Sequence, residues 1–404
     1  MNKSTALLLI VTIMVASCIV TVKPANALTE QWVEKAPMPT GRYNFGAATV
    51  NDTIYAIGGL AKVFDEHTYE HGRTGTTNVN EAYDSAADTW VEKTPMPAPN
   101  WLDTFGIAVY QGKIYCIGGP ANNVYDPATD TWEAKRAMPT QRHFLCANVV
   151  DGKIYLIGGR TMEKATDTGD YWLPGLMTYN TSDVNEVYDS ATNSWTRKAS
   201  IPNPVASYAS AVVNNKIYII SGCTPSGKIT GLVQVYDPQT DNWSLAAPIP
   251  NPVENAAAGA VLNAASDAVY VIGGCTESHR LSGSNFNQVY FPENDSWTTA
   301  TPINSNTRAL SIAVVNNTLY AIGGISDNSD FYSSAVYQYS PTELTTPHPT
   351  IKPSQSPTSP LLVIALVATV ATVIVSVAVL LWKKTKCNKV IVFKKKRTYV
   401  CLQS

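Results

Sequence analysis

The sequence lacks the short motifs that several classes of enzyme and metal protein require. Its 404 residues contain no CxxC pair, no HExxH, no GxSxG and no phosphate-binding glycine loop. Histidine is scarce, and the five residues of this type are His67, His71, His143, His279 and His348. Four of the seven cysteines lie between residues 28 and 341, which is too few for a disulfide scaffold. Neither a disulfide-stapled fold nor a sequence-local metal site is therefore expected.

Acidic residues are absent after Pro360, and this absence divides the chain. All 31 Asp and Glu residues precede Pro360, so residues 28–360 carry a net charge of −12, whereas the eight Lys and Arg residues after Trp382 are unopposed. Leu361–Trp382 is an uncharged apolar run of 22 residues, which spans about 33 Å as a helix. The pattern predicts one transmembrane α-helix and a basic cytoplasmic tail at 383–404. The tail suits contact with anionic lipid and the setting of orientation rather than binding to nucleic acid.

Two other segments are expected to lie outside the folded domain. Residues 1–27 combine Lys3, a long apolar run and the small-residue sequence Ala25-Asn26-Ala27, which predicts a signal peptide. Cys18 follows a lipobox-like sequence inside that run, so lipidation stays open. Residues 342–360 are rich in Pro, Thr and Ser and predict an extended stalk. The folded domain is therefore expected at residues 28–341, outside the cell.

One pattern recurs six times within this domain. Each copy has an apolar run, a polar turn, a second apolar run and a glycine pair; after a variable gap come a run ending in Tyr and, in five copies, a Trp. The second runs with the residues that follow are TIYAI and Gly58-Gly59, KIYCI and Gly118-Gly119, KIYLI and Gly158-Gly159, KIYII and Ser221-Gly222, AVYVI and Gly273-Gly274, and TLYAI and Gly323-Gly324. Four short strands repeated six times predict an all-β propeller with six blades.

The first and last copies complement each other. The array begins with an orphan strand that contains Trp32, and the sixth copy has no Trp of its own. We therefore expect the N-terminal strand to complete the sixth blade, which closes the ring and removes an open sheet edge.

The pattern resembles the kelch repeat family from Trp32 to about Tyr339. Its departures are Ser221 in place of a glycine, Phe291 in place of a turn Asp, and the sixth copy without Trp. The resemblance implies a kelch-type β-propeller in which the repeated Gly, Tyr and Trp residues are structural. It also implies two kinds of function, because kelch propellers include interaction domains, a copper oxidase of galactose and a sialic acid epimerase.

The candidate binding residues lie on one face of the expected propeller. Short turns lie on the opposite face, whereas the variable gaps, including long insertions at 60–80 and 160–185, lie on this one, where binding usually resides. The chain enters each first strand from the same face. The residues at these positions are Arg42, Trp101, Asp103, Arg142, His143, Glu254 and Arg308. The three arginines could hold a carboxylate or sulfate; alternatively, these residues tie loops and blades together.

Five sequons mark candidate glycosylation sites. Asn51, Asn242, Asn294 and Asn316 are expected on the short-turn face, and Asn180 in the long insertion of the third copy. Glycans on the first four would leave the other face free.

Cys223 and Cys275 occupy equivalent places in neighbouring copies, so one disulfide stays open, whereas Cys116 and Cys146 lie in apolar runs and are expected to be buried.

Two functions remain open at this stage. The first is a cell-surface binding module, anchored by one membrane span, that presents a propeller face to an extracellular protein or glycan. The alternative is a carbohydrate-active enzyme, epimerase-like or oxidase-like, at the pore mouth. No cofactor is predicted, because His67 and His71 share one loop and the two His and two Tyr of a copper centre are not evident. We expect a monomeric propeller and no nucleic-acid partner.

Overall fold

The computed structural model describes residues 31–63, 73–97, 104–164, 177–262, 266–276, 282–327 and 332–341. The chain divides into two compact units, residues 1–348 and 349–404, and the described residues all belong to the first. The predicted signal peptide, stalk, membrane span and tail lie outside the described residues. The described part contains strands and no α-helix, and within it no helix is long and apolar enough to cross a membrane.

The described strands form six four-stranded antiparallel sheets, numbered here by the order of their first strands. Sheet 1 contains β3 (Gly46–Val50), β4 (Thr53–Ile57), β7 (Asn80–Asp84) and β8 (Thr89–Lys93). Sheet 2 contains β9 (Gly106–Tyr110), β10 (Lys113–Gly118), β11 (Ala121–Asp126) and β12 (Thr131–Ala134). Sheet 3 contains β13 (Ala147–Val150), β14 (Lys153–Ile157), β17 (Asn185–Asp189) and β18 (Ser194–Lys198).

The other three sheets repeat this order. Sheet 4 contains β19 (Ala209–Val213), β20 (Lys216–Ile220), β21 (Val233–Asp237) and β22 (Asn242–Ala246). Sheet 5 contains β23 (Ala257–Val261), β24 (Ala268–Ile272), β25 (Asn287–Phe291) and β26 (Ser296–Thr299). Sheet 6 contains β28 (Ser311–Val315), β29 (Thr318–Ile322), β31 (Val336–Tyr339) and β1 (Val33–Lys35).

Smaller ladders extend one end of three sheets. They are β2 (Arg42–Tyr43) with β5 (Leu60–Val63) and β6 (Arg73–Thr76), β15 (Arg160–Lys164) with β16 (Met177–Thr181), and β27 (Thr307–Arg308) with β30 (Ile325–Ser326). Each ladder lies in the gap between a second and a third strand, or where the chain enters a first strand. The structure thus adds paired strands to the face on which the sequence predicted the long insertions.

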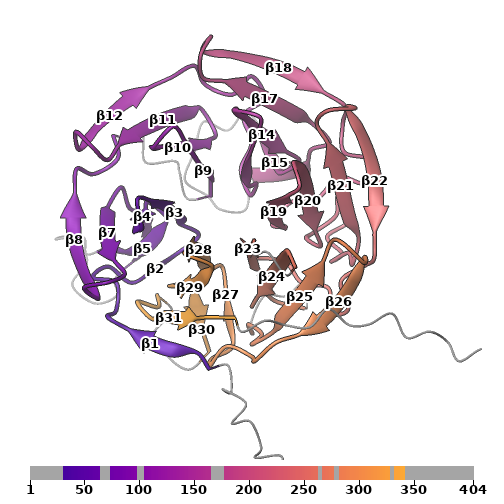
Figure 1. Cartoon of the computed structure of the whole chain (residues 1–404). Helices are drawn as coiled ribbons and strands as arrows, with labels where there is room; N and C mark the ends of the chain where they lie inside the picture. The colour runs from indigo at the N-terminus through magenta and orange to yellow at the C-terminus, as the bar shows by residue number, and fades with distance from the viewer. Residues whose placement is uncertain are drawn as a thin grey trace, which may run out of the picture. The chain divides into compact units, whose positions relative to one another are not determined.

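The six sheets are arranged as a ring, with the first strands innermost and the fourth strands outermost (Figure 1). Contacts between first strands run in a closed cycle from β3 through β9, β13, β19, β23 and β28 back to β3. In sheet 6, β1 pairs with β31 in antiparallel register, with Glu34 opposite Tyr337. The prediction that the N-terminal strand completes the last sheet is therefore confirmed.

Local sequence explains why each sheet begins with a tight hairpin. Asn51 and Asp52, which join β3 to β4, have φ angles of 48° and 62°. A two-residue turn with both angles positive matches the right-handed twist of the strands, and Asn, Asp and Gly tolerate it best. The second strands, such as β14, are buried along nearly their whole length, because neighbouring sheets cover both of their faces.

The glycine pairs end the second strands for a steric reason. Gly59 has a φ of +92°, and an added Cβ would lie 2.6 Å from the Cβ of Phe45. In sheet 4, Ser221 replaces the first glycine of the pair and still adopts a φ of 60°. Its hydroxyl oxygen lies 2.7 Å from the carbonyl oxygens of both Thr230 and Val253, so the serine joins two segments at the point of crowding.

Tyr and Trp form a repeated hydrogen-bonded seam between neighbouring sheets. Tyr125 donates from its hydroxyl to Asp130 at 2.6 Å, and Asp130 also accepts the backbone N–H of Thr94 from the preceding sheet. The indole N–H of Trp132 donates to the carbonyl oxygen of Thr94 at 2.9 Å. One residue of the preceding sheet is therefore held at both its N–H and its carbonyl. The same indole-to-carbonyl bond recurs at Trp32, Trp90, Trp195, Trp243 and Trp297.

Candidate functional site

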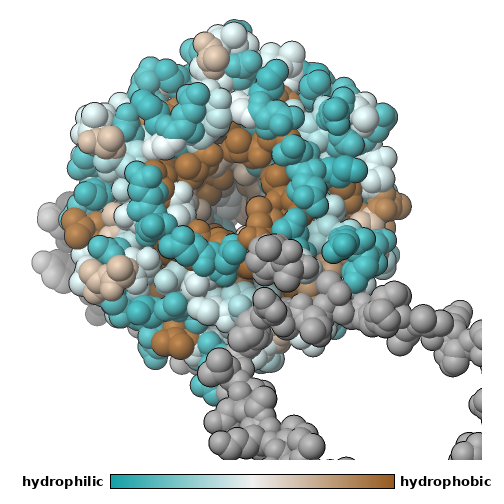
Figure 2. All heavy atoms as spheres, in the orientation of Figure 1, coloured by the Kyte–Doolittle hydropathy of each residue, from teal (hydrophilic) through white to brown (hydrophobic). Residues whose placement is uncertain are grey.

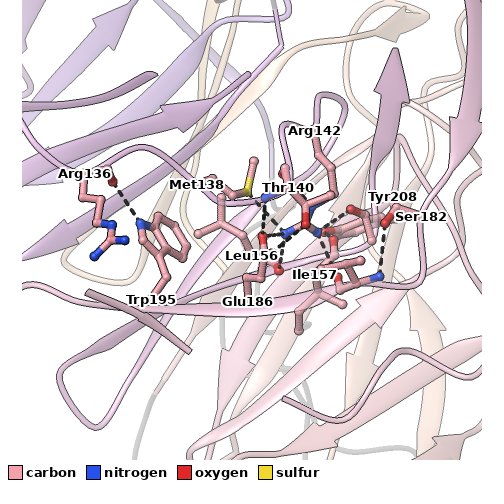
Figure 3. A network of polar contacts seen from close by, with 12 residues as sticks. Arg136, Met138, Thr140, Arg142, Leu156, Ile157, Ser182, Glu186, Trp195 and Tyr208 are labelled. Atoms are coloured by element: carbon pink, nitrogen blue, oxygen red, sulfur yellow. Dashed lines mark hydrogen bonds and ion pairs between the residues drawn. The ribbon is translucent and has the colours of Figure 1, made fainter. Parts of the chain in front are cut away.

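Arg42 and Arg142, two of the predicted ligand-binding residues, occupy equivalent buried positions in sheets 1 and 3. Neither residue has exposed surface. Arg142 Nη2 lies 2.9 Å from Glu186 Oε2, and its Nη1 donates to the carbonyl oxygens of Gly158 and Val184 at 2.7 and 2.8 Å (Figure 3). The guanidinium group thus holds the segment before the first strand against the second and third strands of its own sheet.

Arg42 makes the matching contacts in sheet 1. Its Nη2 lies 2.7 Å from Glu81 Oε2 and 2.9 Å from the carbonyl oxygen of Ala56. Thr40 donates to the other carboxylate oxygen of Glu81 at 2.7 Å, as Thr140 does to Glu186. Burial lowers the pKa of Arg42 to about 10, and the charge of Glu81 opposes that shift. Even so, the group stays charged at neutral pH, and its charge is balanced inside the sheet.

Sheets 4 and 5 fill the same positions with uncharged residues. Val253 stands where sheets 1 and 3 have arginine, and Gln288 stands where they have glutamate. Gln288 accepts the backbone N–H of Asn251 at 2.9 Å and donates to the carbonyl oxygen of Asn251 at 3.0 Å. In both cases, the contacts hold the segment before the first strand against the third strand of the same sheet. Ligand binding by Arg42 or Arg142 stays a prediction. The contacts that these arginines make hold the segment before the first strand in place.

The remaining predicted site residues lie one position further along the chain. His143 exchanges backbone hydrogen bonds with Arg160, and Glu254 does so with Cys275, directly after the glycine pairs. His143 and Glu254 are buried. Arg308 belongs to β27 and is 8% exposed, and its Nη1 atom has no hydrogen-bond partner among the described residues. The structure therefore does not bring Arg308 into the equivalent position of Arg42 and Arg142. Trp101 and Asp103 lie outside the described residues.

The four described cysteines are free thiols. Cys116 is buried as expected, whereas Cys146 is only partly buried. Cys275 Sγ lies 3.5 Å from the carbonyl oxygen of Glu254 and 3.9 Å from its Oε1. Burial raises the pKa of the Cys223 thiol, and the nearby charge of Glu254 raises it further. The Cys223 thiol therefore stays protonated at neutral pH. Within the described ranges, no three His, Cys, Asp or Glu side chains are grouped so that they could hold a metal ion.

A ring of residues that the sequence analysis missed forms the mouth of the central channel. Five residues at equivalent points of five sheets, two or three positions before the first strand, have positive φ angles near 55°: Asn44, Phe144, Ser207, Asn255 and Ala309. Backbone N–H groups in this ring donate to the equivalent carbonyl of the preceding sheet, from Asn44 to Ala309, Ala309 to Asn255, Asn255 to Ser207, and Ser207 to Phe144. These bonds measure 2.8 to 3.0 Å. We call this set the mouth ring.

Large side chains follow the mouth ring and turn toward the channel. With the ring they line a depression of about 120 Å³, and its lining includes Phe45, Phe105, Leu145, Tyr208 and Leu310. Tyr208 donates its hydroxyl proton to the carbonyl oxygen of Ile157, and burial raises its pKa far above the usual range. The recurrence of a large side chain at this position in five of the six sheets was the available sequence signal. From the side viewed in Figure 1, apolar residues surround the central opening of the ring, and polar residues lie around them (Figure 2).

The sheets, the glycine pairs and the Tyr–Trp seam together define a kelch-type β-propeller. The chain belongs to the Attractin/LZTR1 beta-propeller family, whose model matches residues 121–346, and the Kelch motif matches residues 41–97. The predicted kelch relationship is therefore confirmed.

Curated relatives match parts of the propeller. The chain is 29% identical over 183 residues to Kelch-like protein terF of Aspergillus terreus, which covers 45% of this chain and 27% of that protein. It is 35% identical over 91 residues to Kelch-like protein 36 of Rattus norvegicus, covering 22% and 14%, and 24% identical over 210 residues to Beta-scruin of Limulus polyphemus, covering 48% and 20%. The chain thus spans less than a third of the length of these relatives.

A solved structure named "Structure of YjhT" shares the fold. It aligns with a TM-score of 0.57 at 19% identity, over 75% of this chain and 95% of that chain. At this level of identity the likeness concerns the architecture alone.

Proposed function

We propose that this chain is a cell-surface interaction protein. In this proposal, residues 28–341 form a six-bladed propeller outside the cell, carried by the stalk at 342–360. A helix at 361–382 crosses the membrane, and the basic tail at 383–404 lies in the cytoplasm. The propeller binds an extracellular protein through the face that carries the mouth ring. Kelch-like relatives support a role as a protein–protein interaction module.

The shape and chemistry of the channel mouth carry this proposal. The depression of about 120 Å³ is smaller than the roughly 300 Å³ at which pockets for small-molecule substrates begin. Among the described residues that line it there is no Asp, Glu, His, Lys or Arg side chain. General acid–base catalysis on a sugar uses such groups. A shallow depression without charged side chains instead matches the centre of a protein interface, where charged residues are depleted.

The sequons favour the same face. Asn51 and Asn316 are the first residues of hairpin turns, and Asn242 and Asn294 lie at the turns between third and fourth strands. All four side chains belong to exposed residues, as does Asn180 on β16. Glycans on the first four would cover the short-turn face and leave the mouth face open to a partner.

The test is photo-crosslinking of the full chain displayed on cells. A photoreactive residue replaces Met162 or Lys228, both exposed beyond the glycine pairs on the mouth face. The matched controls carry it at Lys153 or Lys216, which are exposed on the short-turn face. We expect one discrete protein adduct from the first pair and none from the second.

Two outcomes would overturn the proposal. One is an adduct that forms only from Lys153 and Lys216, which would place the interface on the other face. The other is conversion of free sialic acid or galactose by the purified chain, followed by NMR, which would support the enzymatic alternative.

A further inference from the structure

The first strands share a repeated pattern that sheet 3 breaks. Two residues before the last residue of each first strand, five sheets have Ala or Gly: Ala48, Ala108, Ala211, Gly259 and Ala313. Sheet 3 has Asn148 at this position. An asparagine in an otherwise small and apolar position costs stability unless its amide is hydrogen-bonded. Its presence therefore calls for a partner.

Among the described residues, only the oxygen of the Asn148 amide has a hydrogen-bond partner. Ser210, on the neighbouring first strand of sheet 4, donates to Asn148 Oδ1 at 2.9 Å. Asn148 is 5% exposed, and its Nδ2 atom has no hydrogen-bond partner among the described residues. Ser210 occupies a position at which the other sheets have Ala or Ile. At the positions equivalent to Asn148 and Ser210, polar residues therefore occur only here, between sheets 3 and 4.

This polar pair borders a cavity inside the channel. The cavity has a volume of about 280 Å³, far above the ~15 Å³ that one water molecule needs. Asn148 and Ser210 line it together with small and aliphatic residues such as Ala147, Ala258 and Ile312. Of the six residues equivalent to Asn148, only Asn148 lines the cavity. No charged side chain belongs to this lining.

We propose that the channel cavity is a binding site for a small uncharged molecule with an apolar body and a hydroxyl group, which is held by Asn148 and Ser210. Asn148 Nδ2 is buried, so the amide rotates toward the cavity when the hydroxyl accepts its hydrogen bond. The hydroxyl donates to Ser210 Oγ, whose own proton is already given to Asn148 Oδ1. The apolar body contacts the alanines and isoleucines. An anion is disfavoured, because no cation lines the cavity to compensate for its desolvation.

The test uses two probes that differ by one hydroxyl group. The first is 1-(4-fluorophenyl)ethanol, and the second is 1-ethyl-4-fluorobenzene. Binding to the full chain in nanodiscs is followed by fluorine NMR, and every variant is compared in nanodiscs of the same lipid so that partitioning into lipid cancels. We expect the alcohol to bind about tenfold more tightly than the ethyl compound, the range of one buried hydrogen bond.

Two variants test separately the hydrogen bond to Asn148 and the volume of the cavity. Asn148→Ala restores the residue type of the other sheets, so it is expected to fold with an unchanged or higher Tm. It should remove the preference for the alcohol while leaving binding of the ethyl compound unchanged. Ala258→Ile copies Ile107 and Ile312 at the equivalent position of sheets 2 and 6, fills the cavity, and should weaken both probes at least tenfold.

Three results would overturn the inference. One is equal binding of the two probes to the natural chain. Another is an Asn148→Ala variant that keeps the preference for the alcohol. The third is an Ala258→Ile variant that binds both probes as the natural chain does, which would place the binding outside the channel. A fall in the Tm of Asn148→Ala with no change in probe preference would assign Asn148 a structural role instead.

Discussion

The indole N–H of Trp32 donates a hydrogen bond of 2.9 Å to the carbonyl oxygen of Thr301, which lies 269 residues further along the chain. Trp32 also stacks on Tyr339, with ring centroids 4.9 Å apart. Trp32, directly before β1, therefore contacts both sheet 5, through Thr301, and sheet 6, through Tyr339. The equivalent tryptophan bonds of the other five seams join residues only 38 to 59 positions apart, so the Trp32 bond links the two ends of the ring.

Removal of the Trp32 side chain should open the ring. We expect Trp32→Ala to lower the free energy of unfolding by about 3–5 kcal/mol, as for other large core aromatics. Loss of β1 from sheet 6 would also expose an unpaired strand edge, which promotes aggregation. Urea unfolding and light scattering measure the two effects. Trp243→Ala, at an internal seam, is the control and should destabilise without aggregation. Equal aggregation of the two variants would contradict this role of Trp32.

The Arg142–Glu186 ion pair should be replaceable as a pair but not singly. Arg142→Val leaves Glu186 buried and unpaired, and we expect a loss of about 3–5 kcal/mol in the free energy of unfolding. The double variant Arg142→Val with Glu186→Gln copies the residues of sheets 4 and 5 and should recover stability to within about 1 kcal/mol of the natural chain. Chemical denaturation compares the two variants. If ligand binding were lost in a double variant of normal stability, Arg142 would have a functional role as well.

Stability should fall in acid because of the tyrosine–aspartate bonds of the seam. The hydroxyl of Tyr125 donates to Asp130 and lowers the pKa of this carboxyl below its ordinary value of 3.8. A lowered pKa in the folded chain adds stability above the unfolded value, and this contribution is lost as the pH falls through the folded value. Asp88 is shifted in the same direction, chiefly by the hydroxyl of Tyr83.

Asp130→Asn isolates this effect. Sheet 3 already has Asn193 at the equivalent position, where Tyr188 donates to it at 2.8 Å, so the variant is expected to fold. The urea midpoint of the variant should drop less than that of the natural chain between pH 6 and pH 3. Parallel curves for the two proteins would show that the carboxylate of Asp130 does not contribute to the acid sensitivity.

The proposed membrane topology can be tested on intact cells. Protease added outside should degrade or release the propeller at the stalk and leave a C-terminal tag protected, because the basic residues after Trp382 favour the cytoplasmic side. Permeabilised cells are the control, in which the tag should be digested. A tag that is already cleaved in intact cells would contradict the proposed orientation.

Features that depend on local geometry could be predicted from the sequence, and features that depend on partners far along the chain could not. Gly58-Gly59 and the turn at Asn51-Asp52 need unusual backbone angles, which only a few residue types adopt readily. Trp32 could be assigned to the last sheet because one repeat lacked its Trp. By contrast, the role of Arg42 depends on Glu81, 39 residues later, and on the register that brings them within 2.7 Å.

Comparison of the repeats with one another would have revealed more of the site. Arginine at position 42 or 142 accompanies glutamate at 81 or 186, whereas valine at 205 or 253 accompanies glutamine at 234 or 288. This coupling indicates a structural pair rather than a free cation at a pore. The mouth ring had a weaker signal, because Phe144 and Ala309 are not residue types that usually mark positive φ angles.

The hydrogen bonds of the mouth ring do not depend on which side chains surround the channel aperture. The five residues of the ring are joined by four main-chain bonds between sheets, in which side chains take no part. Asn, Phe, Ser and Ala are all accommodated at equivalent points of this ring. Side chains around the aperture can therefore be exchanged without loss of these bonds. A lineage of such proteins could alter which partner it recognises by substitutions there, while the frame that presents them keeps its main-chain bonds.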